Sequence, residues 1–163
     1  EDVLPLFLER LRNEITRLAA LKSLRFVASS HLNSSGSGGL DLSPIIGEAT
    51  TDIATFLLQQ SRPLKQAALE CLSAFVAGHS ASMSRDMVAP ALHESARMVN
   101  DSDMQLSHQA LQLASSVLMH SPTWADLLAD VRDAAIELSA SSLLQGQTLS
   151  SLLSFFDALS AVP

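Results

Sequence analysis

Apolar residues recur along this chain at intervals of three and four positions, the spacing that places them on one face of an α-helix. The clearest segment is 61–77, where Pro63 falls in the first turn and its missing N–H costs no helical hydrogen bond. The apolar stripe of this segment consists of Leu69, Leu72, Phe75 and Val76. No segment shows the alternation that is typical of a half-buried strand. The pattern therefore predicts an all-α protein.

The same spacing predicts eight helices in four antiparallel pairs. Their approximate ranges are 3–11, 14–30, 44–60, 61–79, 85–99, 102–119, 123–138 and 142–159. Residues that favour helix starts precede several of them. We expect Ser43 to cap a helix that has Pro44 at its first position. We also expect three capping boxes, at Ser102/Gln105, Thr123/Asp126 and Ser142/Gln145.

The second helix of each pair carries a similar motif of small residues and leucines. Its anchor leucines are Leu21, Leu69, Leu111 and Leu149, with spacings of 48, 42 and 38 residues. HEAT-type helical repeats have periods of about 40–47 residues. We therefore predict an α-solenoid of about four HEAT-type pairs in one segment, 1–163. The repeats are 1–31, 41–79, 83–120 and 123–162, and we expect the Gly/Ser-rich insertion 33–39 to be a flexible loop.

The composition favours helices that are buried on two sides, because 47% of the residues are hydrophobic and only 4% are aromatic. No apolar run approaches the length of about 18 residues that a membrane span needs, so we expect no membrane contact. The chain begins and ends within repetitive helix, and we expect it to be a fragment of a longer solenoid. The last helix should then expose apolar side chains and promote self-association. Those side chains are Leu152, Phe155, Phe156 and Leu159.

The net charge of −7 argues against nucleic acid as a partner, since a phosphate backbone attracts basic surfaces. Cys71 is the single cysteine and cannot form an internal disulfide. It fits a reducing compartment, and we expect a cytoplasmic and nuclear protein in which Cys71 is a small buried side chain.

The titratable residues do not form a recognisable catalytic or metal-binding motif. None of the five histidines has a partner at metal-ligand spacing. His31, His79 and His120 fall near the ends of second helices, where a donor satisfies the last-turn carbonyl groups. Asp103, Ser107 and His108 are residue types of a catalytic triad, but serine is abundant here and chance supplies such neighbours. We expect no enzyme activity, no metal and no cofactor.

Two cations occupy equivalent positions in the first and second repeats. Arg17 and Lys65 lie in the middle of the apolar stripe of their helices, pointing towards the junction between repeats. In HEAT repeats an arginine at this position often bridges to an aspartate six residues earlier. Only Asp101 has a suitable position, and its own repeat has Ser107 in place of the cation. We expect a structural role for both cations and an incomplete ladder, in which Asp101 can still pair with a cation of the previous repeat.

Three stretches go beyond generic HEAT character. They are VLPLFLERLRNEITRL at 3–18, SDM at 102–104, and SLLQGQTL at 142–149 with FFDAL at 155–159. Over most of its length the chain resembles the middle of the cullin-associated and neddylation-dissociated (CAND) family, although the insertion at 33–39 departs from the family pattern. The resemblance implies a non-catalytic solenoid that wraps a cullin–RING ubiquitin ligase scaffold and exchanges its substrate-receptor modules. The alternative is another HEAT scaffold, such as a segment of a nuclear transport receptor or a phosphatase scaffold.

A helical wheel indicates which surface would meet a protein partner. Second helices of HEAT pairs line the concave side of a solenoid, where partners usually bind. Polar positions beside the apolar stripe form a column on that side, and a solvated face without a partner is the alternative interpretation. The candidate partner-binding residues are Lys22, Arg25, Gln66, Glu70, His108, Gln112, Ser115 and Ser150.

Overall fold

The structure, a computed structural model, describes residues 3–33 and 39–163. Its α-helices are α1 (Val3–Arg12), α2 (Arg17–Asn33), α3 (Ile46–Phe56), α4 (Arg62–His79), α5 (Arg85–Ala96), α6 (Met104–His120), α7 (Ala129–Ser139) and α8 (Gly146–Ser160). Two short 3₁₀ segments, η1 (Ser80–Ser82) and η2 (Pro122–Leu128), complete the described secondary structure. The predicted all-α solenoid is confirmed. The insertion at 33–39 lies mostly outside the described residues and stays a prediction.

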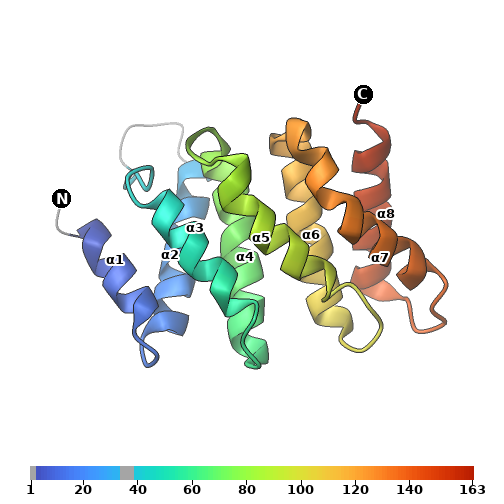
Figure 1. Cartoon of the computed structure of the whole chain (residues 1–163), viewed down its shortest axis with the longest axis horizontal. Helices are drawn as coiled ribbons and strands as arrows, with labels where there is room; N and C mark the ends of the chain where they lie inside the picture. Colours follow the sequence, from blue (N-terminus) through green and yellow to red (C-terminus); the bar gives the residue numbers. More distant parts are fainter. Residues whose placement is uncertain (1–2, 34–38) are drawn as a thin grey trace.

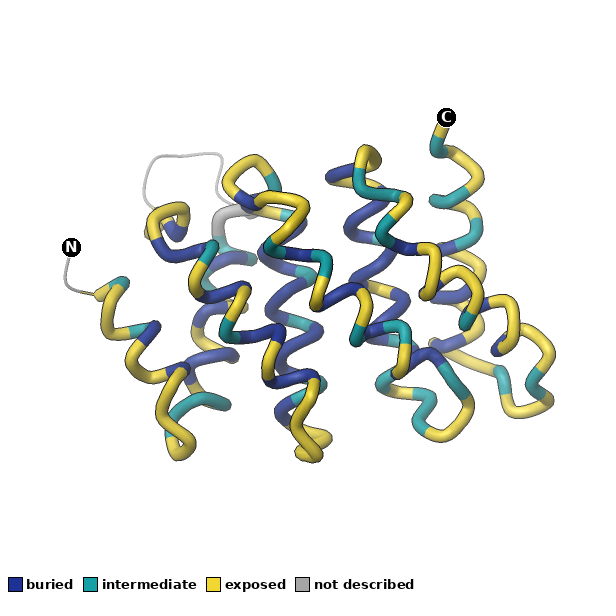
Figure 2. Tube along the Cα trace, viewed as in Figure 1, coloured by how far each residue is buried: buried dark blue, intermediate teal, exposed yellow. Residues whose placement is uncertain are grey.

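The helices form two layers (Figure 1). The odd-numbered helices lie side by side in the front layer, and the even-numbered helices lie behind them. The even-numbered helices make the more extensive contacts with one another. Buried positions concentrate on α4 and α6, which have neighbours on both sides (Figure 2). This arrangement explains a hydrophobic content that is high for a chain of this length.

Three of the four anchor leucines are core residues. Leu21, Leu69 and Leu111 are fully buried. The prediction for the last anchor is wrong, because Leu149 is 38% exposed and Leu152 takes the buried position on α8. The last helix has no following neighbour among the described residues, so one of its two leucine stripes faces solvent.

The apolar side chains that are exposed near α8 therefore differ from those that the sequence predicts. Leu152 and Phe155 are buried against the preceding helices, and Phe156 and Leu159 are partly buried. The large apolar side chains that are exposed in this region are Ile136, Leu143, Leu149 and Leu153. Self-association through this surface stays a prediction.

The helix starts show how local chemistry decides between adjacent cap residues. Ser61 caps α4 by accepting a hydrogen bond from the Leu64 N–H, with Pro63 in the first turn as expected. At α6 the cap is Asp103, whose Oδ1 accepts from the N–H groups of Gln105 and Leu106 at 3.1 Å. The prediction of Ser102 as the cap is therefore wrong by one residue.

The other predicted caps are also wrong. Ser43 and Pro44 lie in a turn before α3, which begins at Ile46 without a side-chain cap. Thr123 lies within η2, so this segment opens as a 3₁₀ helix and becomes α-helical only at α7. At α8 the chain enters through Gly146, whose φ of 59° is a left-handed conformation that suits glycine. No side-chain cap hydrogen bond forms there.

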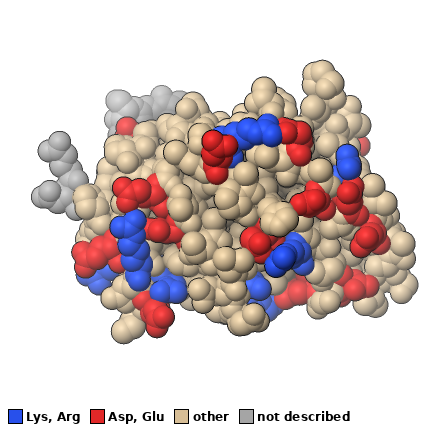
Figure 3. Space-filling model, viewed as in Figure 1, with Lys and Arg blue, Asp and Glu red and all other residues tan. Residues whose placement is uncertain are grey.

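Ion pairs bridge the odd-numbered helices across the surface shown in Figure 3. Arg12 of α1 donates to Glu48 and Asp52 of α3, in both cases at 2.9 Å. Arg85 of α5 forms a bidentate pair with Asp126 in η2. These contacts join neighbouring repeats across the odd-numbered layer. Because these side chains are exposed, each pair adds only modestly to stability.

The predicted ladder of cations and aspartates is replaced by a different set of contacts. Arg62 binds Asp103 of the next repeat through Nε–Oδ2 and Nη2–Oδ1, at 2.5 and 3.0 Å. Asp101 accepts from Ser141 Oγ of the following repeat at 2.9 Å and is not the partner of Arg62. Arg17 lies 5.3 Å from the ring centroid of Phe56, a cation–π contact that supports its structural role.

Candidate functional site

A groove runs across the face formed by the even-numbered helices. It has a volume of about 850 Å³ and is lined by residues of α2, α4, α6 and α8. Serine is the most frequent lining residue, at Ser29, Ser73, Ser115, Ser116, Ser150, Ser151 and Ser154. Because a hydroxyl both donates and accepts hydrogen bonds, this surface can satisfy many different polar groups.

Most of the predicted partner-binding residues line this groove. The structure places Arg25, Glu70, His108, Gln112, Ser115 and Ser150 together on its surface. Lys22 and Gln66 lie on the same helices, α2 and α4, but outside the groove. Several lining residues were not predicted, among them Ser73, Ser116 and Met119.

Polar contacts connect the even-numbered helices across the groove. Glu70 of α4 accepts from Arg25 of α2 and, through Oε1, from Gln109 Nε2 of α6 at 2.6 Å. This carboxylate therefore links three consecutive repeats. Gln109 is only 5% exposed, and its buried Oε1 has no hydrogen-bond partner in the structure. Periodicity does not predict this contact, because Gln109 falls among core positions of its helix.

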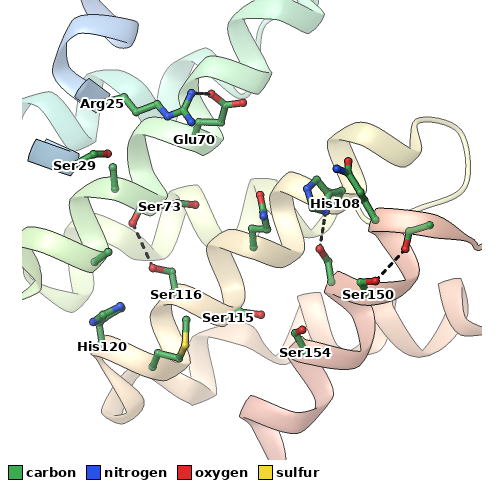
Figure 4. A pocket seen from close by; sticks show the side chains of 17 residues that line it. Arg25, Ser29, Glu70, Ser73, His108, Ser115, Ser116, His120, Ser150 and Ser154 are labelled. Atoms are coloured by element: carbon green, nitrogen blue, oxygen red, sulfur yellow. Dashed lines mark hydrogen bonds and ion pairs between the residues drawn. The ribbon is translucent and has the colours of Figure 1, made fainter. Parts of the chain in front are cut away.

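Serine hydroxyls make further contacts between α4, α6 and α8 (Figure 4). His108 Nδ1 lies 2.5 Å from Ser151 Oγ. Ser116 Oγ donates to the backbone carbonyl of Ser73 at 3.3 Å. The close-up shows the labelled serines and histidines distributed along the groove rather than gathered at one point. Such a distribution suits an extended contact surface.

The three residues of triad type do not act together. Ser107 is fully buried, and its hydroxyl donates to the carbonyl of Met98 at 2.8 Å. Asp103 binds Arg62 and the first turn of α6, while His108 contacts Ser151. No nucleophile–base–acid chain connects them.

Electrostatically the groove is close to neutral. Its one guanidinium, Arg25, and its one carboxylate, Glu70, form an ion pair with each other. Behind it, burial raises the pKa of the Cys71 thiol well above its ordinary value, which keeps the thiol protonated and unreactive. Cys71 is a fully buried side chain, as expected.

Within 3–33 and 39–163, no group of three or more His, Cys, Asp or Glu side chains is placed to hold a metal ion. No helix in the same ranges is both long and apolar enough to cross a membrane.

Solved structures share the arrangement of helices. A crystal structure of an engineered protein matches all of this chain and 64% of its own length with a TM-score of 0.78 at 12% identity. A designed armadillo repeat protein in complex with the peptide (KR)4 matches 95% of this chain with a TM-score of 0.74 at 14% identity. At these identities the similarity shows the fold alone.

Curated relatives extend the similarity to sequence. Cullin-associated NEDD8-dissociated protein 1 of Drosophila melanogaster is 32% identical over 160 residues, 96% of this chain. Cullin-associated NEDD8-dissociated protein 2 of Rattus norvegicus is 34% identical over 98% of this chain. Cullin-associated NEDD8-dissociated protein 1 of Dictyostelium discoideum is 34% identical over 96% of this chain. The chain spans 12% of the length of each of these relatives. No family model matches the chain. Over almost its whole length, the chain is therefore homologous to a segment of the cullin-associated NEDD8-dissociated (CAND) family.

Proposed function

We propose that this chain is part of a non-catalytic scaffold that binds cullin–RING ubiquitin ligase scaffolds and promotes exchange of their substrate-receptor modules. The groove on the even-numbered helices is the contact surface. The observation that carries the proposal is the similarity to CAND proteins of animals and an amoeba along almost the whole chain. The groove supports it, because predicted candidate residues of all four repeats lie there on one continuous surface.

The chemistry of the groove suits a partner that must be released again. An interface of hydroxyl, amide and imidazole groups binds through many weak hydrogen bonds, and water replaces those bonds when the partner leaves. The main charges, Arg25 and Glu70, already neutralise each other. Binding therefore does not depend on one strong buried ion pair, and affinity is spread over the surface.

The binding step is tested with the chain itself and purified cullin–RING complexes, by biolayer interferometry. Gln112→Glu and Ser150→Glu place new charges at exposed positions in the groove. We expect the double variant to weaken binding by about tenfold, since two uncompensated charges oppose desolvation. The matched control, Ser102→Glu with Ser142→Glu, changes exposed turn residues outside the groove. Equal affinities of the two double variants, or no binding by the unmodified chain, would refute the proposal.

Charged pairs on the odd-numbered helices are unsuitable as controls. Glu48 and Asp52 bind Arg12, so their reversal breaks a contact between repeats. Reversing Arg25 and Glu70 together is also uninformative, because the pair can form again with its charges exchanged. Reversal of Arg25 alone avoids this compensation.

The exchange step is tested in a longer protein. This chain replaces the aligned segment of the Drosophila melanogaster relative, and dissociation of a labelled substrate receptor from its cullin complex is followed by fluorescence. We expect the chimera to accelerate dissociation and the groove double variant to do so less. A chimera that binds the complex but leaves dissociation unchanged would contradict the exchange role while retaining the binding role.

A further inference from the structure

A second groove lies on the opposite layer, between α3 and α5. It has a volume of about 340 Å³, at the lower end of the range of ligand-binding clefts. Small side chains on one wall, such as Ala54 and Thr55, face Pro90 and Met87 on the other. Leu58 forms one end and is 59% exposed. The groove is therefore mainly apolar and open to solvent.

The junction of α3 with α5 differs from its two neighbours in the contacts that cross it. Arg12 spans the junction of α1 with α3, and His93 lies 2.9 Å from Asp130 across the junction of α5 with α7. Among the described residues, no ion pair joins α3 to α5. Instead Met87 packs against Gly47, where an added Cβ would lie 3.0 Å from the Met87 Cε. Beyond this contact the two helices leave the groove unfilled.

The rim of the groove is acidic. Among the described residues, Asp86, His93 and Glu94 of α5 line it, and Glu94 also lies 3.6 Å from Arg97, which is outside the groove. The side chain of Asp86 is exposed in the first turn of α5. Pro90 has no N–H, so the backbone carbonyl of Asp86 lacks its usual helical donor four residues later. Two carboxylates and a carbonyl thus surround an apolar floor.

We infer that this groove binds a protein segment that presents an aliphatic or aromatic side chain between basic residues. An apolar side chain fills the space beside Met87 and Pro90 and removes the exposed part of Leu58 from water. Lysine or arginine on either side of it meets Asp86 and Glu94. The net charge of −7 attracts such a segment from a distance. Figure 3 shows this face, with uncharged surface lying between charged groups.

The two grooves carry one methionine each, which allows a direct test. Met87 lines the groove between α3 and α5, and Met119 lines the groove on the even-numbered helices. The probe is a peptide with a leucine–phenylalanine pair flanked by arginines, added to the chain labelled with ¹³C at the methionine methyl groups. We expect a saturable shift of the Met87 signal and an unchanged Met119 signal. An unchanged Met87 signal at millimolar peptide would overturn the inference.

Two further peptides separate the contributions. Replacement of the leucine–phenylalanine pair by glycines should abolish the Met87 shift, and replacement of the arginines by glutamates should do the same. Equal binding of the glutamate peptide would show that a hydrophobic ligand of any charge fits, which contradicts the inferred partner. A Met87 shift that depends on protein concentration without peptide would identify a second copy of the chain as the occupant and also overturn the inference.

Variants locate the contact. Thr55→Trp fills the groove from an exposed helix position, and we expect it to weaken peptide binding at least about tenfold. Its control is Ser102→Trp, at an exposed turn. Leu58→Asp is a second variant with the same expectation if the tryptophan disturbs folding. Asp86→Asn with Glu94→Gln should weaken binding roughly three- to tenfold and reduce its salt dependence, whereas Glu137→Gln should not.

This inference is independent of the proposed function. Cullin binding at the even-numbered helices should shift Met119, and binding of the basic peptide should shift Met87. Because Met87 also borders a third groove beside Arg12, a Met87 shift supports binding between α3 and α5 only if Thr55→Trp abolishes it.

Discussion

Replacement of Asp103 should destabilise this solenoid through two separable contributions, the loss of a helix cap and the loss of an ion pair. The Asp103 carboxylate caps α6 and also binds Arg62 of the preceding repeat. Removal of an N-cap costs about 1 kcal/mol, and loss of the exposed ion pair adds a small further cost. We therefore expect Asp103→Ala to lower the free energy of unfolding by at least about 1 kcal/mol. With a urea m-value of about 2 kcal/mol/M, the midpoint falls by at least about 0.5 M.

The same interactions give the effect a defined pH dependence. The hydrogen bond from Arg62 and those from the N–H groups of Leu106 and Gln105 hold the pKa of Asp103 below its ordinary value. A carboxylate whose pKa is lowered by folding stabilises the folded state above its unfolded pKa of about 3.9. This contribution is lost as the pH falls through the lower, folded pKa. The stability difference between the unmodified chain and Asp103→Asn should therefore be constant from pH 7 to about 5 and shrink below about pH 4.

Three controls identify the origin of the loss. Ser102→Ala should change stability little, because Ser102 is not the cap. Asp126→Ala removes a comparable ion pair, with Arg85, but no α-helix cap, and should cost less. A double-mutant cycle of Arg62→Ala with Asp103→Ala should give a small favourable coupling that isolates the ion pair from the cap. An Asp103→Ala variant that is no less stable than Asp126→Ala would show that the cap contributes nothing and refute the reasoning.

Three further predictions concern the core. Leu152→Ala should lower the free energy of unfolding by about 2–5 kcal/mol, measured in urea. Leu149→Ala should lower it by less than about 1 kcal/mol, because Leu149 already faces solvent. Similar losses for the two variants would contradict the observed orientation of α8. Cys71 should react with a disulfide reagent only as the chain unfolds, since its thiol is buried and its pKa is raised; rapid labelling of the native chain would contradict this. Gly47→Ala should change the free energy of unfolding by less than about 1 kcal/mol, because the gain in helix propensity offsets a small shift of the flexible end of Met87. A larger loss in thermal or urea unfolding would show that Met87 cannot move.

The sequence predicted the helices better than their ends. Periodicity reports burial averaged over several turns, which is why the described helices lie within a few residues of their predicted ranges, except for the start of α7, where η2 precedes the α-helix. Caps depend on the backbone angles of one residue. Ser102 and Asp103 are both good cap formers in adjacent positions, and only the path of the chain selects Asp103. On α8, Leu149 and Leu152 offer two alternative stripes, and the packing of α6 decides between them.

The sequence predicts those features of the groove on the even-numbered helices that depend on a single helix. A helical wheel places Arg25, Glu70 and His108 on one side of their helices, and the structure places all three on the groove. A wheel contains no information on the offset between neighbouring helices. The contacts of Glu70 with Gln109 and of His108 with Ser151 depend on that offset, and they could not be foreseen.

The contacts that join the even-numbered helices also have a mechanical consequence. Ser116 and Ser151 reach their neighbours with a hydroxyl one bond from Cβ, and the Ser116 contact, at 3.3 Å, is already at the long end of hydrogen-bond distances. These contacts tolerate almost no further separation of the helices. On the other layer Arg12 and Arg85 bridge with long, flexible arms, which can follow a neighbour as it moves. When the stack bends, the junctions of α4, α6 and α8 that these serines join should therefore act as the hinge line, and the spacing of the odd-numbered helices should take up the deformation.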